Sequence, residues 1–191
     1  MVEVKQIVCG ELNENCYIVK KDNDAIIIDP GDNYEKIVDY ITLKKLNVHA
    51  VLLTHGHYDH ISSCKRLQNL GYKIYVHELD AEKCKDNELN LSLSFSHSEI
   101  ETFNPDILLK GNETLLFNDI KVITMHTPGH SEGGCCYIID KYIFSGDTLF
   151  KNGIGRIDFY DGSLNKIIQS IKKISEFVSN GYILCDGHEF N

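Results

Sequence analysis

Short apolar runs separated by polar clusters open the chain, and this spacing is typical of strands joined by tight turns. The expected strands lie at residues 2–8, 16–19 and 25–29. The period then changes to that of a helix, with apolar side chains at Tyr34, Ile37, Val38 and Ile41. Because such a stripe buries one helix face, we expect a β-meander with a helix packed against the sheet.

Strand and helix signals alternate in the next part of the chain. We expect a strand at residues 48–53, a helix from about residue 59 to 70 that Gly71 ends, and a strand at 73–77. Residues 84–110 are polar and irregular, which predicts a long surface loop that could lie over a site. The pattern as a whole predicts a βαβ-like unit followed by this loop.

Strands return in the last part of the chain. They are expected at residues 114–117, 120–125, 134–139, 142–144 and 182–185. A helix begins near Ser163 and presents one apolar stripe, formed by Leu164, Ile167, Ile168, Ile171, Ile174 and Phe177. Two strand-rich parts, each with helices, predict an α+β fold in which two stacked mixed sheets lie between helical layers.

Composition narrows the class of protein. The 191 residues, of which 42% are hydrophobic and 25% charged, suit one globular domain at residues 1–191. Nineteen Lys and Arg against 28 Asp and Glu give a formal net charge of −9, which opposes binding to nucleic acid or to an anionic membrane. No apolar stretch approaches the roughly 20 residues of a membrane span. The seven cysteines are odd in number and lack a Cys-x-x-Cys spacing. We therefore expect a cytoplasmic protein with reduced thiols.

Three histidines and an aspartate fall within residues 54–60, directly after an apolar run typical of a buried strand. Imidazole and carboxylate groups suit zinc, iron or manganese. Alternate residues of an extended segment lie on the same side, so His55 and His57 can bind one ion together. Asp59 and His60 lie where the chain turns into a helix and point to a neighbouring position, which predicts two metal ions.

Three later loops supply the further ligands that a two-metal site needs. His130, Asp147 and His188 each follow the end of an expected strand, and each is preceded by glycine. Loops at one edge of stacked sheets bring side chains together, and glycine lets the backbone turn tightly beside an ion. The repeated glycine before a candidate ligand favours one shared site.

Six short motifs, spread over nearly the whole chain, carry a resemblance to a known family. They are Asn15-Cys16-Tyr17, Asp29-Pro30-Gly31, the Thr-His-x-His-x-Asp-His run at 54–60, Thr127-Pro128-Gly129-His130-Ser131, Ser145-Gly146-Asp147-Thr148-Leu149-Phe150 and Gly187-His188-Glu189. In this order they resemble the metallo-β-lactamase-fold superfamily, in its glyoxalase II-like (hydroxyacylglutathione hydrolase-like) branch.

The resemblance implies both a fold and a ligand set. The fold is an αββα four-layer sandwich, in agreement with the pattern of strands and helices. One metal ion is bound by His55, His57 and His130, a second by Asp59, His60 and His188, and Asp147 bridges the two. Zinc is the expected metal, with iron or manganese as alternatives.

Hydrolysis of a small hydroxyacyl thioester is the activity that this branch implies. Two cations can share a hydroxide at neutral pH, and this hydroxide would attack the carbonyl of the thioester. The thiolate would then leave without strong help from a general acid. Asp59 would orient the nucleophile and Asp147 would set the metal separation, so we predict both as catalytic residues. Two-domain glyoxalase II enzymes continue into a helical domain that helps bind glutathione, whereas three residues follow His188 here. We therefore expect a single-domain hydrolase and assume no glutathione specificity.

Residues 155–162 occupy the region where relatives place basic and tyrosine side chains that contact substrate. Arg156 and Tyr160 are the candidates for substrate binding. Arg156 suits a bidentate contact with a substrate carboxylate, and equally a structural ion pair with Asp158. Other polar residues receive structural roles, namely Ser62 and Ser63 in the first turn of the helix expected at 59–70, Asp29 in a turn, and His49, His77, His97 and His126 on the surface or in the core.

Three other functions stay open. Persulfide dioxygenases resemble the chain in fold and motif but bind one iron through two histidines and a carboxylate, which here would be His55, His130 and Asp147. A lactonase on the same fold is the second. The third is a non-enzymatic metal-binding protein, which the complete ligand set disfavours.

Overall fold

Six strands form the first sheet, and their order in the sheet is their order in the sequence. In the computed structural model, which describes residues 1–189, they are β1 (Glu3–Cys9), β2 (Glu14–Lys21), β3 (Asp24–Ile28), β4 (Asn47–Leu52), β5 (Ile74–His77) and β6 (Ile107–Leu109). The first three strands pair antiparallel and the others parallel. The sheet is mixed because short turns follow β1 and β2, whereas long crossover connections follow β3, β4 and β5.

The second sheet contains five strands in the order β13-β10-β9-β8-β7. They are β7 (Thr114–Phe117), β8 (Ile120–His126), β9 (Cys135–Ile139), β10 (Tyr142–Gly146) and β13 (Ile183–Asp186). Only β10 and β13 pair parallel, and their register shifts between Phe144 and Gly146. A small two-stranded sheet of β11 (Leu149–Phe150) and β12 (Gly153–Ile154), absent from the expected elements, follows β10.

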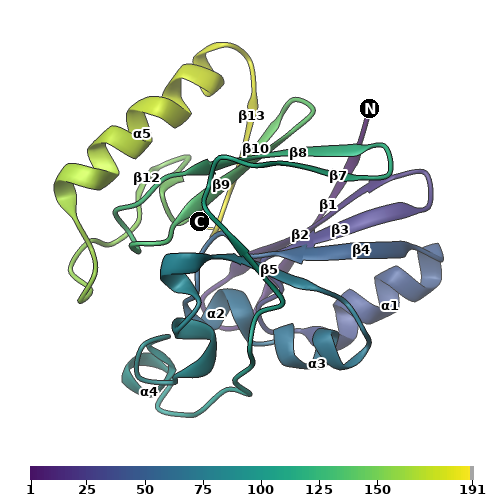
Figure 1. Ribbon diagram of the computed structural model, residues 1–191, viewed down its shortest axis with the longest axis horizontal. Helices are drawn as coiled ribbons and strands as arrows, with labels where there is room; N and C mark the ends of the chain where they lie inside the picture. Colours follow the sequence, from purple (N-terminus) through teal and green to yellow (C-terminus); the bar gives the residue numbers. More distant parts are fainter. Residues whose placement is uncertain (190–191) are drawn as a thin grey trace.

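Helices cover the outer face of each sheet (Figure 1). They are α1 (Tyr34–Lys44), α2 (Tyr58–Ile61), α3 (Cys64–Asn69), α4 (Ser92–Phe95) and α5 (Leu164–Ser179). In Figure 1, α5 lies on one side of the two sheets, and α1 and α3 lie on the other. The four layers are therefore helix, sheet, sheet and helix, and the predicted αββα arrangement is confirmed.

The single helix predicted over residues 59–70 is wrong, because α2 ends before Ser62 and α3 begins after Ser63. The backbone N–H of Ser63 donates to the carbonyl of Pro30, 3.1 Å away, and its hydroxyl donates to the carbonyl of Gly31. The Ser62 hydroxyl donates to the carbonyl of Tyr58. These bonds to a distant turn and to the preceding helix interrupt the helical ladder.

The core between the two sheets follows from the alternation of side chains along the strands. On β2, Tyr17 and Val19 face the second sheet and pack in a cluster with Phe144 of β10. Cys16 and Ile18 point to the opposite face, toward the helices. Because both faces of β2 are covered, nearly the whole strand is buried.

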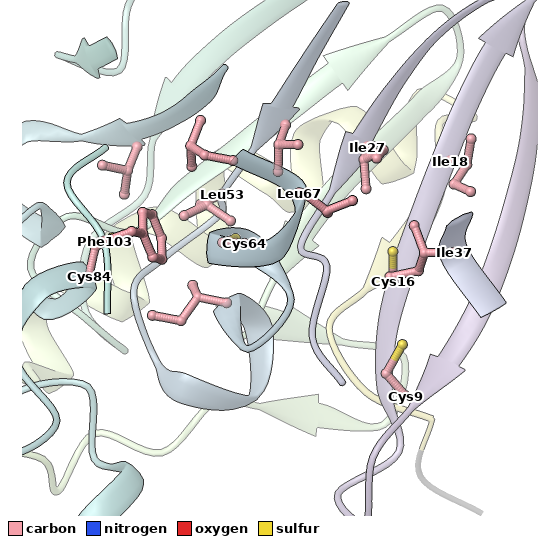
Figure 2. Close-up of a cluster of buried hydrophobic side chains, with 14 of the residues drawn as sticks. Cys9, Cys16, Ile18, Ile27, Ile37, Leu53, Cys64, Leu67, Cys84 and Phe103 are labelled. Atoms are coloured by element: carbon pink, nitrogen blue, oxygen red, sulfur yellow. The ribbon is translucent and has the colours of Figure 1, made fainter. Parts of the chain in front are cut away.

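Apolar side chains also fill the space between the first sheet and its helices. Figure 2 shows part of this cluster, in which Ile37 of α1 and Leu67 of α3 lie against the sheet residues Ile18 and Ile27. Cysteines contribute to it as small apolar groups, and all seven in the chain are buried free thiols.

The apolar stripe of α5 differs from the prediction at its start. Ile167 and Ile174 are buried, and Ile174 packs in a cluster with residues of the second sheet, but Leu164 and Ile168 are exposed. Ser170 takes a buried position because its hydroxyl donates to the carbonyl of Pro128, 2.8 Å away. A polar residue thus occupies the core-facing side of the helix.

The segment predicted as an irregular loop at 84–110 contains ordered elements. Strand β6 pairs with β5, so the sheet extends one strand further than expected. Helix α4 is a single turn, and Phe103 is buried in the core on the helical side. The segment therefore completes the first sheet and brings α4 close to the candidate site. Within residues 1–189, no helix is both long and apolar enough to cross a membrane.

Candidate metal centre

The loop after β4 carries the first candidate ligands. His55 and His57 lie in its extended part, and His60 lies on α2. The N–H of Gly56 donates to Asp80 Oδ2 at 2.9 Å, and the N–H of Tyr58 donates to a backbone carbonyl at 2.9 Å. These bonds hold the loop from outside, so the histidine side chains face inward.

His55, His57 and His130 form the first group. One ligand atom from each lies within 4.8 Å of the other two, and all three side chains are buried. Nδ1 of His57 lies 2.9 Å from Nε2 of His130. The ring centroid of His55 is 4.6 Å from that of His57 and 4.8 Å from that of His130. The structure thus brings together three imidazoles from two distant loops, as the spacing and the resemblance predicted.

Asp59, His60 and His188 form the second group, again with one ligand atom from each within 4.8 Å of the others. Nε2 of His188 lies 3.3 Å from Oδ2 of Asp59 and 3.3 Å from Nε2 of His60. Two imidazoles and one carboxylate therefore converge beside the first group.

Asp147 lies between the two groups. Its Oδ2 is 3.5 Å from Nε2 of His130 and 3.3 Å from Nε2 of His188. Its Oδ1 is 3.3 Å from Nε2 of His60. The register shift at the end of β10 directs the chain into this position. One carboxylate therefore faces side chains of both groups, which is the geometry of a bridging ligand.

Hydrogen bonds on the far side of the rings orient three of these imidazoles. Nδ1 of His130 lies 2.8 Å from the carbonyl of Arg156, and Nδ1 of His188 lies 2.9 Å from the carbonyl of Leu12. Nδ1 of His60 lies 3.1 Å from the carboxylate of Asp29. Because these acceptors require a proton on Nδ1, each ring presents the lone pair of Nε2 to the centre.

Asp29 contacts a candidate ligand, a position that the sequence interpretation did not assign to it. It is buried with a positive φ of 48°, so its side chain turns back toward the loop after β4. Its carboxylate accepts from the N–H of Thr54 at 2.7 Å and from the Thr54 hydroxyl at 2.6 Å, besides binding His60. Its predicted role in a local turn is therefore incomplete. The available signal was the Asp29-Pro30-Gly31 motif, one of the six that carry the family resemblance.

The two groups differ in electrostatics. Burial, with the neighbouring imidazoles, holds the pKa of His55 and of His57 well below the ordinary value. Burial also opposes the charge of His60, but Asp147 and Asp59 outweigh it and raise the pKa well above the ordinary value. The same balance, led by Asp147, raises the pKa of His188 to about 10. The second group thus lies in a strongly negative field that a bound cation would neutralise.

Two glycines let the backbone approach the candidate ligands. A Cβ at Gly187 would collide with Oδ1 of Asp147, as the glycine-before-ligand pattern predicted. A Cβ at Gly155, which the sequence did not single out, would collide with the carbonyl of Asp147 and lie 2.8 Å from Nδ1 of His130. Any larger residue at either position would displace a candidate ligand.

The residues present fit divalent cations. Nε2 of His55 is buried and has no hydrogen-bond partner among the described residues, an arrangement that costs free energy unless a ligand takes its lone pair. Five imidazoles and two carboxylates are the nitrogen and oxygen donors that zinc, iron and manganese accept. The donor set is thus complete for two ions.

A cavity of about 440 Å³ opens onto these side chains. Arg156 lines it, but the guanidinium is largely exposed and contacts both carboxylate oxygens of Asp158 at 2.9 and 2.8 Å. Tyr160 does not line this cavity, and its hydroxyl lies 3.3 Å from the carbonyl of Leu89. The structural ion pair of Arg156 is therefore present, and a substrate role for Arg156 or Tyr160 stays a prediction.

Comparison with known proteins identifies the family of the chain. The chain matches the Metallo-beta-lactamase superfamily over residues 9–188. It is 34% identical over 185 residues to the hydroxyacylglutathione hydrolase GloC of Haemophilus influenzae, covering 92% of this chain and 85% of that protein. The crystal structure of BLEG-1 B3 metallo-beta-lactamase shares 31% identity, with a TM-score of 0.93 over 98% of this chain and 92% of that one. The structure of TTHA1623 in a di-iron-bound form shares 27% identity, with a TM-score of 0.85 over 97% and 92%.

The fold, the clustered histidines and aspartates, and these relatives define the class. The chain belongs to the metallo-β-lactamase superfamily, and the resemblance inferred from its motifs is confirmed. It is a metallohydrolase of that superfamily with candidate His and Asp groups for metal binding.

Proposed function

We propose that this chain binds two divalent cations and hydrolyses a small hydroxyacyl thioester. The observation that carries the proposal is the position of Asp147 between two groups of three ligand candidates. A single ion does not require the second group of Asp59, His60 and His188. The assembly of all seven side chains favours the dinuclear hydrolase over the one-iron dioxygenase, whose triad would be His55, His130 and Asp147.

The residues around the centre have separate tasks in this reaction. When bound, two divalent cations supply the Lewis acidity that lowers the pKa of water from about 15.7 toward about 7 and polarises a carbonyl. Asp147 fixes the separation of the two positions. Asp59 lines the cavity beside His188, so its carboxylate is placed to accept a hydrogen bond from the attacking water and orient it.

The lining of the cavity favours a thioester over an amide or an ordinary ester. Apart from the candidate ligands and Arg156, Tyr58 is the one described residue lining the cavity whose side chain could act as a general acid. Burial, followed by the charge of Asp59, raises the pKa of Tyr58 and makes it a weaker acid. A thiolate leaves without protonation because free thiols have a pKa near about 8.5. The relative from Haemophilus influenzae is named a hydroxyacylglutathione hydrolase, which also supports a thioester as the bond that is cleaved.

Metal analysis followed by assay of the same sample tests the proposal. Protein purified without added metal should contain two ions per chain and hydrolyse lactoyl thioesters. His188→Ala should lose the ion of the second group, and His130→Ala the ion of the first. His49→Ala is the matched control, because His49 pairs with Asp24 in another part of the sheet.

Other outcomes would refute the assignment in distinct ways. One iron per chain with persulfide-dependent oxygen uptake would show a dioxygenase. Hydrolysis of lactones but not thioesters would show a lactonase. Two bound ions with no turnover on either class would show a metal-binding protein without this activity.

A further inference from the structure

The cavity above the candidate ligands has an apolar wall, which we define as Leu12, Leu91, Phe95, Phe150, Ile154 and Phe159. The five candidate ligands His57, Asp59, His130, Asp147 and His188 form its polar side. A reacting carbonyl held at these ligands would therefore have an apolar surface directly beside it. This arrangement is typical of a small-molecule site with a few convergent polar groups.

Aromatic rings lead from the ligands out along this wall. The ring of Phe159 lies edge-on to His57 and His130, with centroids 5.0 and 5.5 Å away. Phe95 of α4 continues the series, with its centroid 5.7 Å from that of Phe159 at an interplanar angle of 83°. Two phenyl rings in this arrangement offer a face and an edge to a third aromatic or branched apolar group.

Part of this wall is exposed to solvent. Phe95 is 46% exposed, Leu12 48% and Ile154 44%. Each lines the cavity. Clustered apolar surface that reaches a polar site is the signature of a surface that a ligand covers. The volume of about 440 Å³ exceeds what a methyl group needs and accommodates a phenyl group.

Positive charge available to a substrate carboxylate is scarce. Arg156 is the one Lys or Arg among the described residues lining the cavity, and Asp158 engages its Nε and one Nη. Its guanidinium carbon lies 4.9 Å from the ring centre of Phe159 and 5.3 Å from that of Phe95. The arginine is thus held as part of the aromatic wall by its own carboxylate partner.

A second cavity of about 620 Å³ adjoins the first and shares Leu12, Tyr58, Asp59 and Phe95 with it. Glu11 and Asp32 also line it, whereas its described lining holds no Lys or Arg and only one imidazole, that of His97. Among the described residues that line this second cavity, Asp59 is the one candidate ligand. A thiol carrier that extends past Asp59 would enter this cavity, where the carboxylates of Glu11 and Asp32 repel an anionic group.

We propose that the site selects hydroxyacyl thioesters whose acyl group carries an aromatic or branched apolar side chain and whose thiol carrier bears no carboxylate. Phe95 and Phe159 are the specificity-determining residues. This inference rests on the proposed thioester hydrolysis. Water adds to the carbonyl carbon, the carbon–sulfur bond breaks, and the products are the hydroxy acid and the free thiol.

Four thioesters test the selection, namely the lactoyl and mandeloyl esters of N-acetylcysteamine and of glutathione. Lactoyl and mandeloyl differ by methyl against phenyl, and the two thiols differ in charge. For the metal-loaded enzyme we expect kcat/KM to be at least about tenfold higher for mandeloyl than for lactoyl on the same thiol. We expect N-acetylcysteamine esters to be preferred to glutathione esters by a similar factor.

Phe95→Ala is the informative variant, because Phe95 contacts none of the candidate ligands in the described interactions. It should remove most of the mandeloyl preference, so that the ratio of kcat/KM for mandeloyl over lactoyl on the same thiol falls by about tenfold. The control is Leu116→Ala, which truncates a side chain that is 71% exposed on β7. The control should leave all four rates unchanged.

Calorimetric binding of uncleavable thioethers separates this proposal from the proposed activity. S-benzyl-N-acetylcysteamine should bind the metal-loaded protein at least about tenfold more tightly than the S-methyl analogue and more tightly than S-benzylglutathione. If thioesters are cleaved but lactoylglutathione is the best of the four and Phe95→Ala changes nothing, the selection is refuted and the hydrolase stands. If no thioester is cleaved while S-benzyl binding still depends on Phe95, the hydrolase is refuted and the apolar ligand class stands. Equal, Phe95-independent binding of all thioethers refutes the selection directly.

Discussion

The seven candidate ligands and the apolar cavity wall differ in how the protein holds them. The ligands are almost entirely buried, and bonds from other parts of the chain fix their rings, such as that from His60 to Asp29. Of the wall, Phe95 and Ile154 are largely exposed and belong to elements of a few residues, α4 and β12. The exposed part of the wall thus lies on short elements, whereas Leu91 and Phe150 of the same wall are buried.

This difference separates the two parts of the function. The ligand cluster lies just beyond the ends of paired strands of both sheets, and these strands fix the positions of its loops. The wall comes from connecting segments, where substitutions alter the cavity without disturbing the sheets. We infer that the sandwich preserves the chemistry, whereas the segments at 84–104 and 150–162 set the substrate.

The largest effect is expected at the centre of the ligand cluster. Asp147→Ala removes the carboxylate that faces both groups, so we expect thioester hydrolysis to fall by more than about 10⁴-fold. Metal content should fall with it, while the circular dichroism spectrum stays that of the wild type. Near-normal turnover with two bound ions would contradict the bridging role.

A buried lysine lies between the ligand loop and the segment that carries part of the cavity wall. Its substitution tests whether the two regions are linked energetically. Lys83 is 2% exposed and contacts Asp80 and, at 2.8 Å, Asp161. Asp80 accepts from the N–H of Gly56 in the ligand loop, whereas Asp161 follows the segment that carries Phe159. Lys83→Met would leave two carboxylates close together without a cation. We expect the free energy of unfolding in urea to fall by about 3–5 kcal/mol.

Lys85→Met is the matched control for this variant. Lys85 pairs with Glu82 on the surface, so its loss should cost less than about 1 kcal/mol. If the two variants unfold at the same urea concentration, the buried network does not stabilise the fold and the link between the regions is not energetic.

Sequence patterns predicted the described strands of four or more residues and missed those of two or three. The apolar run of β2 and the periodicity of α1 were readable because each pattern extends over several residues. Strands β6, β11 and β12 have two or three residues, too few to show a period. The break between α2 and α3 arises from the carbonyl of Pro30, a partner some thirty residues away. Interactions of that range leave no local signal.

At the candidate site, too, the sequence predicted some features and missed others. All seven predicted ligands come together, because several His and Asp residues placed directly after strand ends are typical of a metal site. The partners that orient the rings include the carbonyls of Arg156 and Leu12, and backbone atoms carry no residue-specific signal. For the wall, the sequence predicted only that a loop at 84–110 could lie over a site. It did not single out Phe95, because that side chain reaches the cavity through the path of residues 78–106.

Asp29 tests how far the ligand cluster depends on its supporting bonds. In Asp29→Asn, an amide NH₂ would face the hydroxyl of Thr54 or Nδ1 of His60, where the carboxylate now accepts two bonds. We expect metal affinity at the second group to fall by about 10–100-fold, measured by competition with a chelator. Asp32→Asn is the control, because Asp32 is exposed and its carboxylate accepts from the adjacent N–H of Asn33. Unchanged affinity in Asp29→Asn would mean that ring orientation does not limit binding.

The smallest effect is expected at Arg156, on the rim of the cavity wall. Its ion pair with Asp158 is exposed, so Arg156→Met should change the free energy of unfolding by less than about 1 kcal/mol. Because we expect the substrate to carry no carboxylate, hydrolysis of the mandeloyl N-acetylcysteamine ester should stay within about fivefold of wild type. A role in holding a substrate carboxylate predicts instead a raised KM for glutathione esters alone. Asp158→Asn distinguishes the two, since it frees the guanidinium and would lower that KM only if Arg156 contacts the substrate.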